Sequence, residues 1–181
     1  MARAGFACTA SEMRTLLAER GWLRNSYSSE LPSQLDDFTE LWLTDAANWL
    51  GPQAADRESL AQLLGRIFVY DAREVLAAPE AHAVLLRKDA RETLRSLASE
   101  VLASETIDSE RFKGIVTALK EKVGHHGRTL FHTIRLALAG KVGEGELDRV
   151  IVLIDRAAAA PGLAPVKTIR ARVLEFCAAL D

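Results

Sequence analysis

The chain has 181 residues, of which 49% are hydrophobic and 27% are charged, and its formal net charge at pH 7 is −2. This length fits one large domain or two small ones, and this composition supports a buried core and excludes an intrinsically disordered chain. No apolar run is long enough for a signal peptide or a membrane span, so we expect a soluble, cytoplasmic protein with no membrane partner.

Helical periodicity dominates the first half of the chain. A first helix is predicted from about Ser11 to Arg20, where Gly21 ends it, and a third from about Ala54 to Tyr70. Between them, a helix that follows Ser33 is stopped by Gly51-Pro52. Its apolar residues recur every three or four positions and are predicted to be buried: Leu35, Phe38, Trp42, Ala46 and Trp49.

Two further helices are predicted before residue 104. Pro79 is suited to the first turn of one, because its missing N–H has no partner there anyway. Asp89 and Glu92 have the spacing of a capping box at the start of the other. The apolar stripe of that second helix is Leu94, Leu97, Val101 and Leu102.

The second half of the chain is helical as well. Asp108 is the predicted N-cap of a helix that Gly124 ends, and a short helix follows that ends at Gly140. Helices from about 145 to 158 and after Pro165 complete the chain. We therefore predict an all-α, multi-helix bundle.

Positive charge is concentrated in one segment. Residues 1–110 carry a net charge of −7 and residues 142–181 one of −1, whereas residues 111–141 carry +6. We call the seven cations of that segment the basic island: Arg111, Lys113, Lys120, Lys122, Arg128, Arg135 and Lys141. Local concentration of charge is typical of an electrostatic binding surface. We divide the chain into an acidic helical subdomain, 1–103, and a subdomain with the basic island, 104–181; one continuous domain is the alternative.

The segment GRTLFHTIRLALAGKVGEGEL (127–147) resembles the C-terminal anticodon-binding region of bacterial glutamyl-tRNA synthetases. That family shows Lys-Gly-x-x-Leu-Phe, then Pro-Leu-Arg-x-Ala-Leu-Thr-Gly, then a Leu-rich helix. Weaker likeness extends over roughly 60–154. The positions that match the pattern are Gly127, Leu130, Phe131, Arg135, Ala137, Leu138, Gly140 and Leu147.

The resemblance implies a tRNA-binding module that contacts the anticodon arm, either a detached piece of a synthetase or a free-standing paralogue. Its partners would be tRNA and a fused or separate catalytic domain; no DNA partner is expected. The chain has neither class I signature, His-x-Gly-His or Lys-Met-Ser-Lys-Ser, and no glycine-rich βαβ turn for ATP. It therefore has no catalytic residues of that chemistry and no predicted cofactor, and only a larger enzyme containing it would be a glutamate–tRNA ligase.

Two positions depart from the family pattern. Thr133 stands where the family usually has Pro, and Ala139 where it usually has Thr. Since the Thr-Gly corner abuts the anticodon in that fold, the missing hydroxyl puts the usual contacts in question.

Side-chain chemistry assigns roles within the island. Arg128 and Arg135 are predicted to read RNA, because a guanidinium stacks on bases and donates hydrogen bonds in pairs. Lys113, Lys120 and Lys122 would attract phosphates, with Lys141 as a backbone contact. His132 lies on the same stripe as the two arginines and completes the predicted RNA-binding set.

Plainer interpretations remain open. The arginine stripe is also compatible with a solvated helix face, and Arg135 with a structural ion pair to Asp108 or Glu146. A helical protein–protein adaptor is the second functional hypothesis, favoured by the acidic N-terminal block and by the two departures from the family pattern. A helical enzyme of unknown type is the third.

No metal site is predicted. His125 and His126 are adjacent and diverge on a helix, no third ligand has suitable spacing, and Cys8 and Cys177 lie near opposite ends of the chain. Trp42 and Trp49 lie on an apolar stripe, so core packing is favoured over base stacking.

Overall fold

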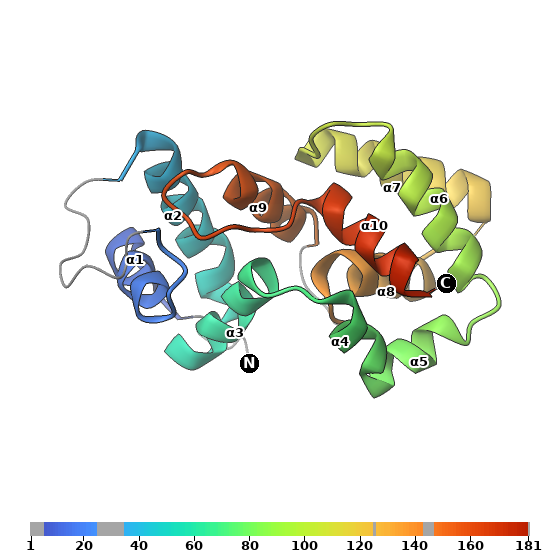
Figure 1. The fold of residues 1–181 in the computed structure, drawn as a ribbon, viewed down its shortest axis with the longest axis horizontal. Coiled ribbons are helices and arrows are strands. Elements are labelled where there is room, and N and C mark those ends of the chain that lie inside the picture. The colour runs from blue at the N-terminus through green and yellow to red at the C-terminus, as the bar shows by residue number, and fades with distance from the viewer. Residues whose placement is uncertain (1–5, 25–34, 125, 143–146, 181) are drawn as a thin grey trace. The chain divides into compact units, whose positions relative to one another are not determined.

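A computed structural model describes residues 6–24, 35–124, 126–142 and 147–180 (Figure 1). Within these ranges the regular structure is helical, and the only strand-like pairing is an isolated bridge between Leu23 and Leu163. The all-α prediction is confirmed. In the same ranges, every helix is too short or too polar to cross a membrane.

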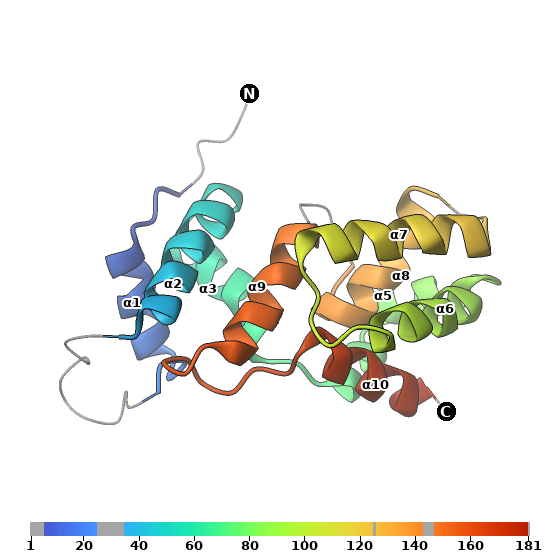
Figure 2. The same ribbon diagram turned by 90° about the horizontal axis from the view of Figure 1, so that it is seen from above.

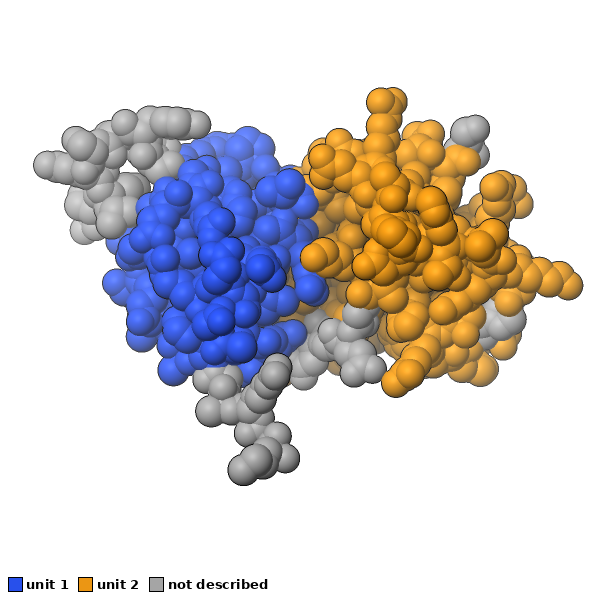
Figure 3. Space-filling model, turned by 90° about the horizontal axis from the view of Figure 1, so that it is seen from below, with its two compact units in different colours: residues 1–69, 156–166 blue, residues 70–155, 167–181 orange. Residues whose placement is uncertain are grey.

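The chain forms two compact units, shown in different colours in Figure 3. Unit 1 contains residues 1–69 and 156–166, and unit 2 contains residues 70–155 and 167–181. These units are defined by the contacts within each of them. The division between residues 103 and 104 was based on the charge distribution and stays a prediction.

Unit 1 is built on three helices with well-defined starts: α1 (Ala10–Glu19), α2 (Asp37–Leu50) and α3 (Arg57–Phe68). A capping box, in which Thr9 and Glu12 exchange hydrogen bonds, begins α1, and the Asp36 and Asp56 side chains cap α2 and α3. The short 3-10 helix η1 (Gly51–Gln53) occupies the predicted Gly-Pro stop.

An aromatic cluster forms part of the unit 1 core. Trp42 is fully buried, as predicted, and meets Phe68 edge-on with ring centroids 5.8 Å apart. Trp22 stacks on the same Phe68 ring at 4.9 Å. Phe38 was predicted to be buried, but it is 40% exposed and lies under the Arg156 guanidinium. Trp49 is only half-buried. The prediction failed because α2 packs through the neighbouring stripe of Trp42, Leu43, Ala46, Ala47 and Leu50.

In unit 2, α6 packs against α7, α8 and α10 (Figures 1 and 2). Another helix, α4, packs against both α5 and α10. The boundary between the units falls within α9 (Leu147–Ala159). The other helices of unit 2 are α4 (Ala72–Ala77), α5 (Pro79–Leu85), α6 (Ala90–Leu102), α7 (Ser109–Val123), α8 (Arg128–Ala139) and α10 (Ile169–Leu180).

Several predicted boundaries shift. The helix expected over 54–70 begins at Arg57, because Asp56 is its N-cap, and ends at Phe68. The capping box predicted at Asp89 is absent, since that residue has helical backbone angles and its side chain makes no cap hydrogen bond. Pro79 begins α5 as expected.

The starts of α7 and α10 are both tied to Asp155 in α9. Its carboxylate accepts hydrogen bonds from Ile169 N at 2.7 Å and from Ile107 N at 3.0 Å. Burial raises the pKa of Asp155, and the two backbone donors oppose that rise. This one side chain thereby fixes the segments that enter two helices of unit 2.

Candidate nucleic-acid interface

The helix that carries three of the island's four lysines begins and ends as predicted. Asp108 accepts a hydrogen bond from Arg111 N at 2.7 Å and caps α7, and Gly124 ends it with a left-handed φ of 69°. Lys113 is exposed and Lys120 is half-exposed. The buried face is Phe112, Ile115, Val116 and Leu119.

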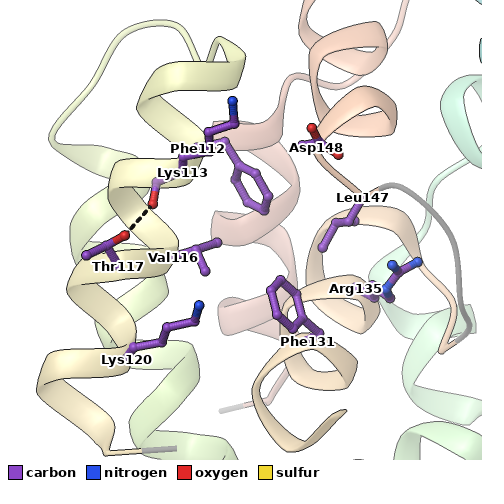
Figure 4. Close-up of a pocket in the computed structure, with 9 residues that line it drawn as sticks. All are labelled: Phe112, Lys113, Val116, Thr117, Lys120, Phe131, Arg135, Leu147 and Asp148. Carbon is purple, nitrogen blue, oxygen red and sulfur yellow. Dashed lines mark hydrogen bonds between the residues drawn. The ribbon is translucent and has the colours of Figure 1, made fainter. Parts of the chain in front are cut away.

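The second helix, α8, buries Leu130, Ile134 and Leu138 as predicted. Phe131 was predicted to point into the core as well, but it is only half-buried. It faces the space between α7, α8 and the start of α9 (Figure 4). The prediction failed because Phe131 lies at the edge of the buried stripe, where the position of α7 decides its exposure.

These elements enclose a groove of about 470 Å³ within unit 2. The side chains of Phe112, Val116, Phe131 and Leu147 point into it (Figure 4). The cations Lys113 and Lys120 lie along α7, Arg135 lies on α8, and Asp148 is the acid in the lining. The groove thus combines an apolar and aromatic floor with a cationic rim.

Three of the six predicted RNA-binding residues line this groove: Lys113, Lys120 and Arg135. The other three lie outside the lining, on α8 or just after it. Arg128 is exposed at the first position of α8, His132 is half-exposed on that helix, and Lys141 is exposed just after it.

One acidic side chain forms ion pairs with two cations of the island. Glu100 on α6, which is only 17% exposed, lies 2.5 Å from Lys122 Nζ and 3.7 Å from Arg111 Nη2. Arg111 also donates to Ser104 Oγ at 2.6 Å and to Glu100 O at 3.1 Å. Arg111 and Lys122 therefore hold α7 against α6. Periodicity within α7 could not reveal this role, because Glu100 lies 11 positions from Arg111 and 22 from Lys122.

The groove lysines are held more loosely. Lys113 makes an exposed i,i+3 pair with Glu110 at 3.4 Å, an arrangement that contributes little. Lys120 Nζ lies 6.0 Å from the centroid of the Phe131 ring. Both ammonium groups can therefore turn to a phosphate at small cost.

The structure bears on two alternatives, a metal site that includes histidines and an ion pair of Arg135 with Asp108 or Glu146. His125 and Glu146 lie outside the described residues. Asp108, the other acid considered as a partner for Arg135, caps α7. Across the described part of the chain, no three His, Cys, Asp or Glu side chains gather as metal ligands.

Comparison with known proteins decides the family. A family model described as "anticodon binding domain" matches residues 18–159, well over half of the chain. The chain belongs to the anticodon-binding domain family. The match begins well before residue 60, where the likeness was expected to start.

Glutamate–tRNA ligases are among the similar proteins. The ligase of Oceanobacillus iheyensis is 26% identical over 129 residues, which cover 71% of this chain and 26% of the ligase. Those of Bacillus thuringiensis and Bacillus velezensis are 32% and 35% identical over 77 residues, which cover 42% of this chain and 16% of each ligase. The chain therefore spans about a quarter or less of these relatives.

Both departures from the family pattern lie in buried positions. Thr133 is 1% exposed, and its hydroxyl donates to Thr129 O at 3.2 Å, so it replaces the family's Pro as an internal helix residue. Ala139 is 8% exposed in the last turn of α8. Neither side chain is placed to make extensive contacts with an RNA.

Two residues from other segments contact the end of α8 in a way that the family pattern did not indicate. The Tyr70 hydroxyl donates to Ala137 O at 2.5 Å, and Arg172 Nη1 donates to Leu138 O at 3.0 Å. Gly140 follows with a left-handed φ of 70°. A fully buried Arg such as Arg172 looks like any exposed helix cation in a sequence, so no local signal could have identified it.

Proposed function

We propose that this chain is a tRNA-binding module of glutamyl-tRNA synthetase type, and that the groove between α7, α8 and α9 contacts the anticodon arm. The observation that carries the proposal is the groove itself, in a member of the anticodon-binding domain family. Loop nucleotides present unstacked bases and phosphates, and proteins bind them with aromatic or guanidinium planes and with cations.

The groove offers these groups at suitable places. Phe131 presents a half-exposed ring between α7 and α8, and Arg135, about one turn further along α8, supplies a planar donor in the groove lining. Lys113 and Lys120 line the α7 side, where they would neutralise phosphates without reading sequence. Arg128, His132 and Lys141 would extend the contact beyond the groove.

The rest of the assignment follows from the relatives. The module would act with a synthetase catalytic domain, on the same chain or a separate one, and would have no aminoacylation activity alone, since the sequence has no class I signature. Glutamate tRNA is the proposed partner because the similar proteins are glutamate–tRNA ligases.

The test is fluorescence anisotropy with labelled tRNA over a salt series. We expect log K to fall with log salt by about 0.7 for each phosphate neutralised. K113A/K120A should weaken binding to all tRNAs and lower this slope by roughly 1.4 if both lysines neutralise phosphates. R128A/R135A should instead reduce the preference for glutamate tRNA over other tRNAs.

A matched control removes two cations elsewhere in unit 2. Lys88 and Arg95 are exposed and lie outside the groove lining, so K88A/R95A makes the same charge change. This double variant should keep the wild-type salt slope. The proposal would be wrong if wild-type binding showed no salt dependence, or if K113A/K120A and K88A/R95A lost equal amounts of affinity and salt slope.

The adaptor hypothesis is the second candidate. It is favoured by Glu100, which already engages Arg111 and Lys122 and so reduces the charge that the island offers to RNA. Absence of tRNA binding at low salt by folded protein would favour the adaptor.

A further inference from the structure

The end of α8 is held by side chains from distant parts of unit 2. The last four carbonyl groups of a helix have no partner within it, and buried ones need donors from elsewhere. Ala137 and Leu138 are both fully buried, and their carbonyls accept from Tyr70 Oη and Arg172 Nη1. Tyr70 precedes α4 and Arg172 lies on α10. Two other segments of the unit therefore cap this helix.

Arg172 is built into the core as a cation. It is fully buried, its guanidinium carbon lies 4.7 Å from the Tyr70 ring centroid, and its Nε donates to Lys167 O at 3.0 Å. Burying a charge is costly unless its donors are satisfied. Two carbonyls, an aromatic face and the negative end of the α8 dipole offset that cost. Burial lowers the pKa of Arg172 to about 10, so the side chain stays charged at neutral pH.

Close packing at the C-terminal end of α8 restricts how the helix can rotate or slide. A Cβ added to Gly140 would lie 3.1 Å from Val75 Cγ2 and 3.6 Å from the Tyr70 ring. The backbone of Gly140 thus packs tightly beside the Tyr70–Arg172 pair. Neither rotation nor sliding of α8 is possible without breaking these contacts.

The same helix carries the groove residues. Arg135 lies three positions before Leu138, and Phe131 lies about one turn earlier. Phe131 points into the groove that the lysines of α7 line, whereas Arg135 lies on the α8 side of the groove with its guanidinium directed away from α7 (Figure 4). A rotation of α8 would therefore move Phe131 and Arg135 relative to Lys113 and Lys120.

We propose that Arg172, acting with Tyr70, is a positioning residue for the groove: it fixes the rotation of α8 so that Phe131 points into the groove and Arg135 lies in its α8 wall, opposite the α7 lysines, as parts of one RNA-binding surface. The inference rests on the proposed function for its link to RNA. It assigns a role in recognition to a buried side chain on α10 that the RNA does not touch.

The experiment compares tRNA binding by R172M, R172K and Y70F with that of wild type, over the same salt series. The salt slope is the decisive readout, because partial unfolding lowers the amount of active protein but leaves the slope of the folded fraction unchanged. We expect R172M to bind about tenfold more weakly and to lose about 0.7 of slope for each phosphate contact that is misplaced. R172K, which keeps the charge but not the planar fork, should lie between R172M and wild type.

Val173 supplies the matched control. It is fully buried on α10 beside Arg172, so V173A weakens the same core without removing a donor to α8. V173A should keep the wild-type slope. Folded R172M and Y70F with the wild-type slope would overturn the inference, and if R172M does not fold, Y70F and R172K decide it.

A second readout separates this inference from the proposed function. Amide NMR shifts of Arg135 and Lys141 should move in Y70F and R172K but not in V173A. If the wild-type protein binds no tRNA, the proposed function fails, and these shifts still decide the positioning role. Unmoved amides in Y70F and R172K would overturn it.

Discussion

Gly140 and Gly124 allow the cost of a left-handed residue to be separated from the cost of crowding. Both end a helix of unit 2, with φ of 70° and 69°. An added Cβ at Gly124 would meet nothing within 4 Å, whereas one at Gly140 would lie 3.1 Å from Val75 Cγ2. The substitutions G124A and G140A thus share a backbone penalty and differ in packing.

The expected magnitudes follow from these distances. A left-handed conformation costs a non-glycine residue about 1–2 kcal/mol. Forcing an extra methyl group against a packed core adds about 1–3 kcal/mol. We therefore expect G124A to lower the free energy of unfolding of unit 2 by about 1–2 kcal/mol, and G140A by about 2–5 kcal/mol.

Urea unfolding followed by circular dichroism measures both variants. A mutation that moves the midpoint without changing the m-value changes stability alone. Equal destabilisation by G124A and G140A would refute the argument that Gly140 is needed for its close approach to Val75 and Tyr70. In that case the glycine would serve only its backbone conformation.

Two further predictions concern charge. E100Q should strengthen tRNA binding and raise the salt slope by about 0.7, because Lys122 loses its ion-pair partner while Arg111 keeps its hydrogen bonds to Ser104 and to a backbone carbonyl. Fluorescence anisotropy measures this, and E92Q, which makes the same charge change at an exposed position of α6, is the control. Equal gains in E100Q and E92Q would contradict the local explanation. Acid should destabilise unit 1, because backbone N–H donors at helix starts lower the pKa of Glu12 and Asp56. Since the folded pKa is below the unfolded one, that stability is complete above the ordinary pKa near 4 and is lost as the pH falls through the lowered value. Thermal melts between pH 5 and pH 2 should show the loss, and D56N, which still caps but does not titrate, should reduce it; an unchanged pH profile in D56N would exclude Asp56 as a contributor.

The predictable part of the candidate site came from α7 and α8. Asp108, Gly124 and Gly140 are local signals, and each limits its helix where the sequence placed it. The spacing of Lys113 and Lys120 put them on one side of α7, and the structure places both along the groove. The groove itself was not predicted, because it depends on how α9 approaches the other two helices.

The amino-acid sequence by itself determined approximately where most of the helices lie, where glycine and proline stop several of them, and that positive charge gathers in residues 111–141. These features depend on residues within a few positions of one another. Only the tertiary structure decided that Phe131 faces a groove, that Glu100 holds Lys122, and that Arg172 caps α8. Each of these depends on packing between helices and on partners 11 to more than 30 positions away, and periodicity along a single helix carries no information about such partners.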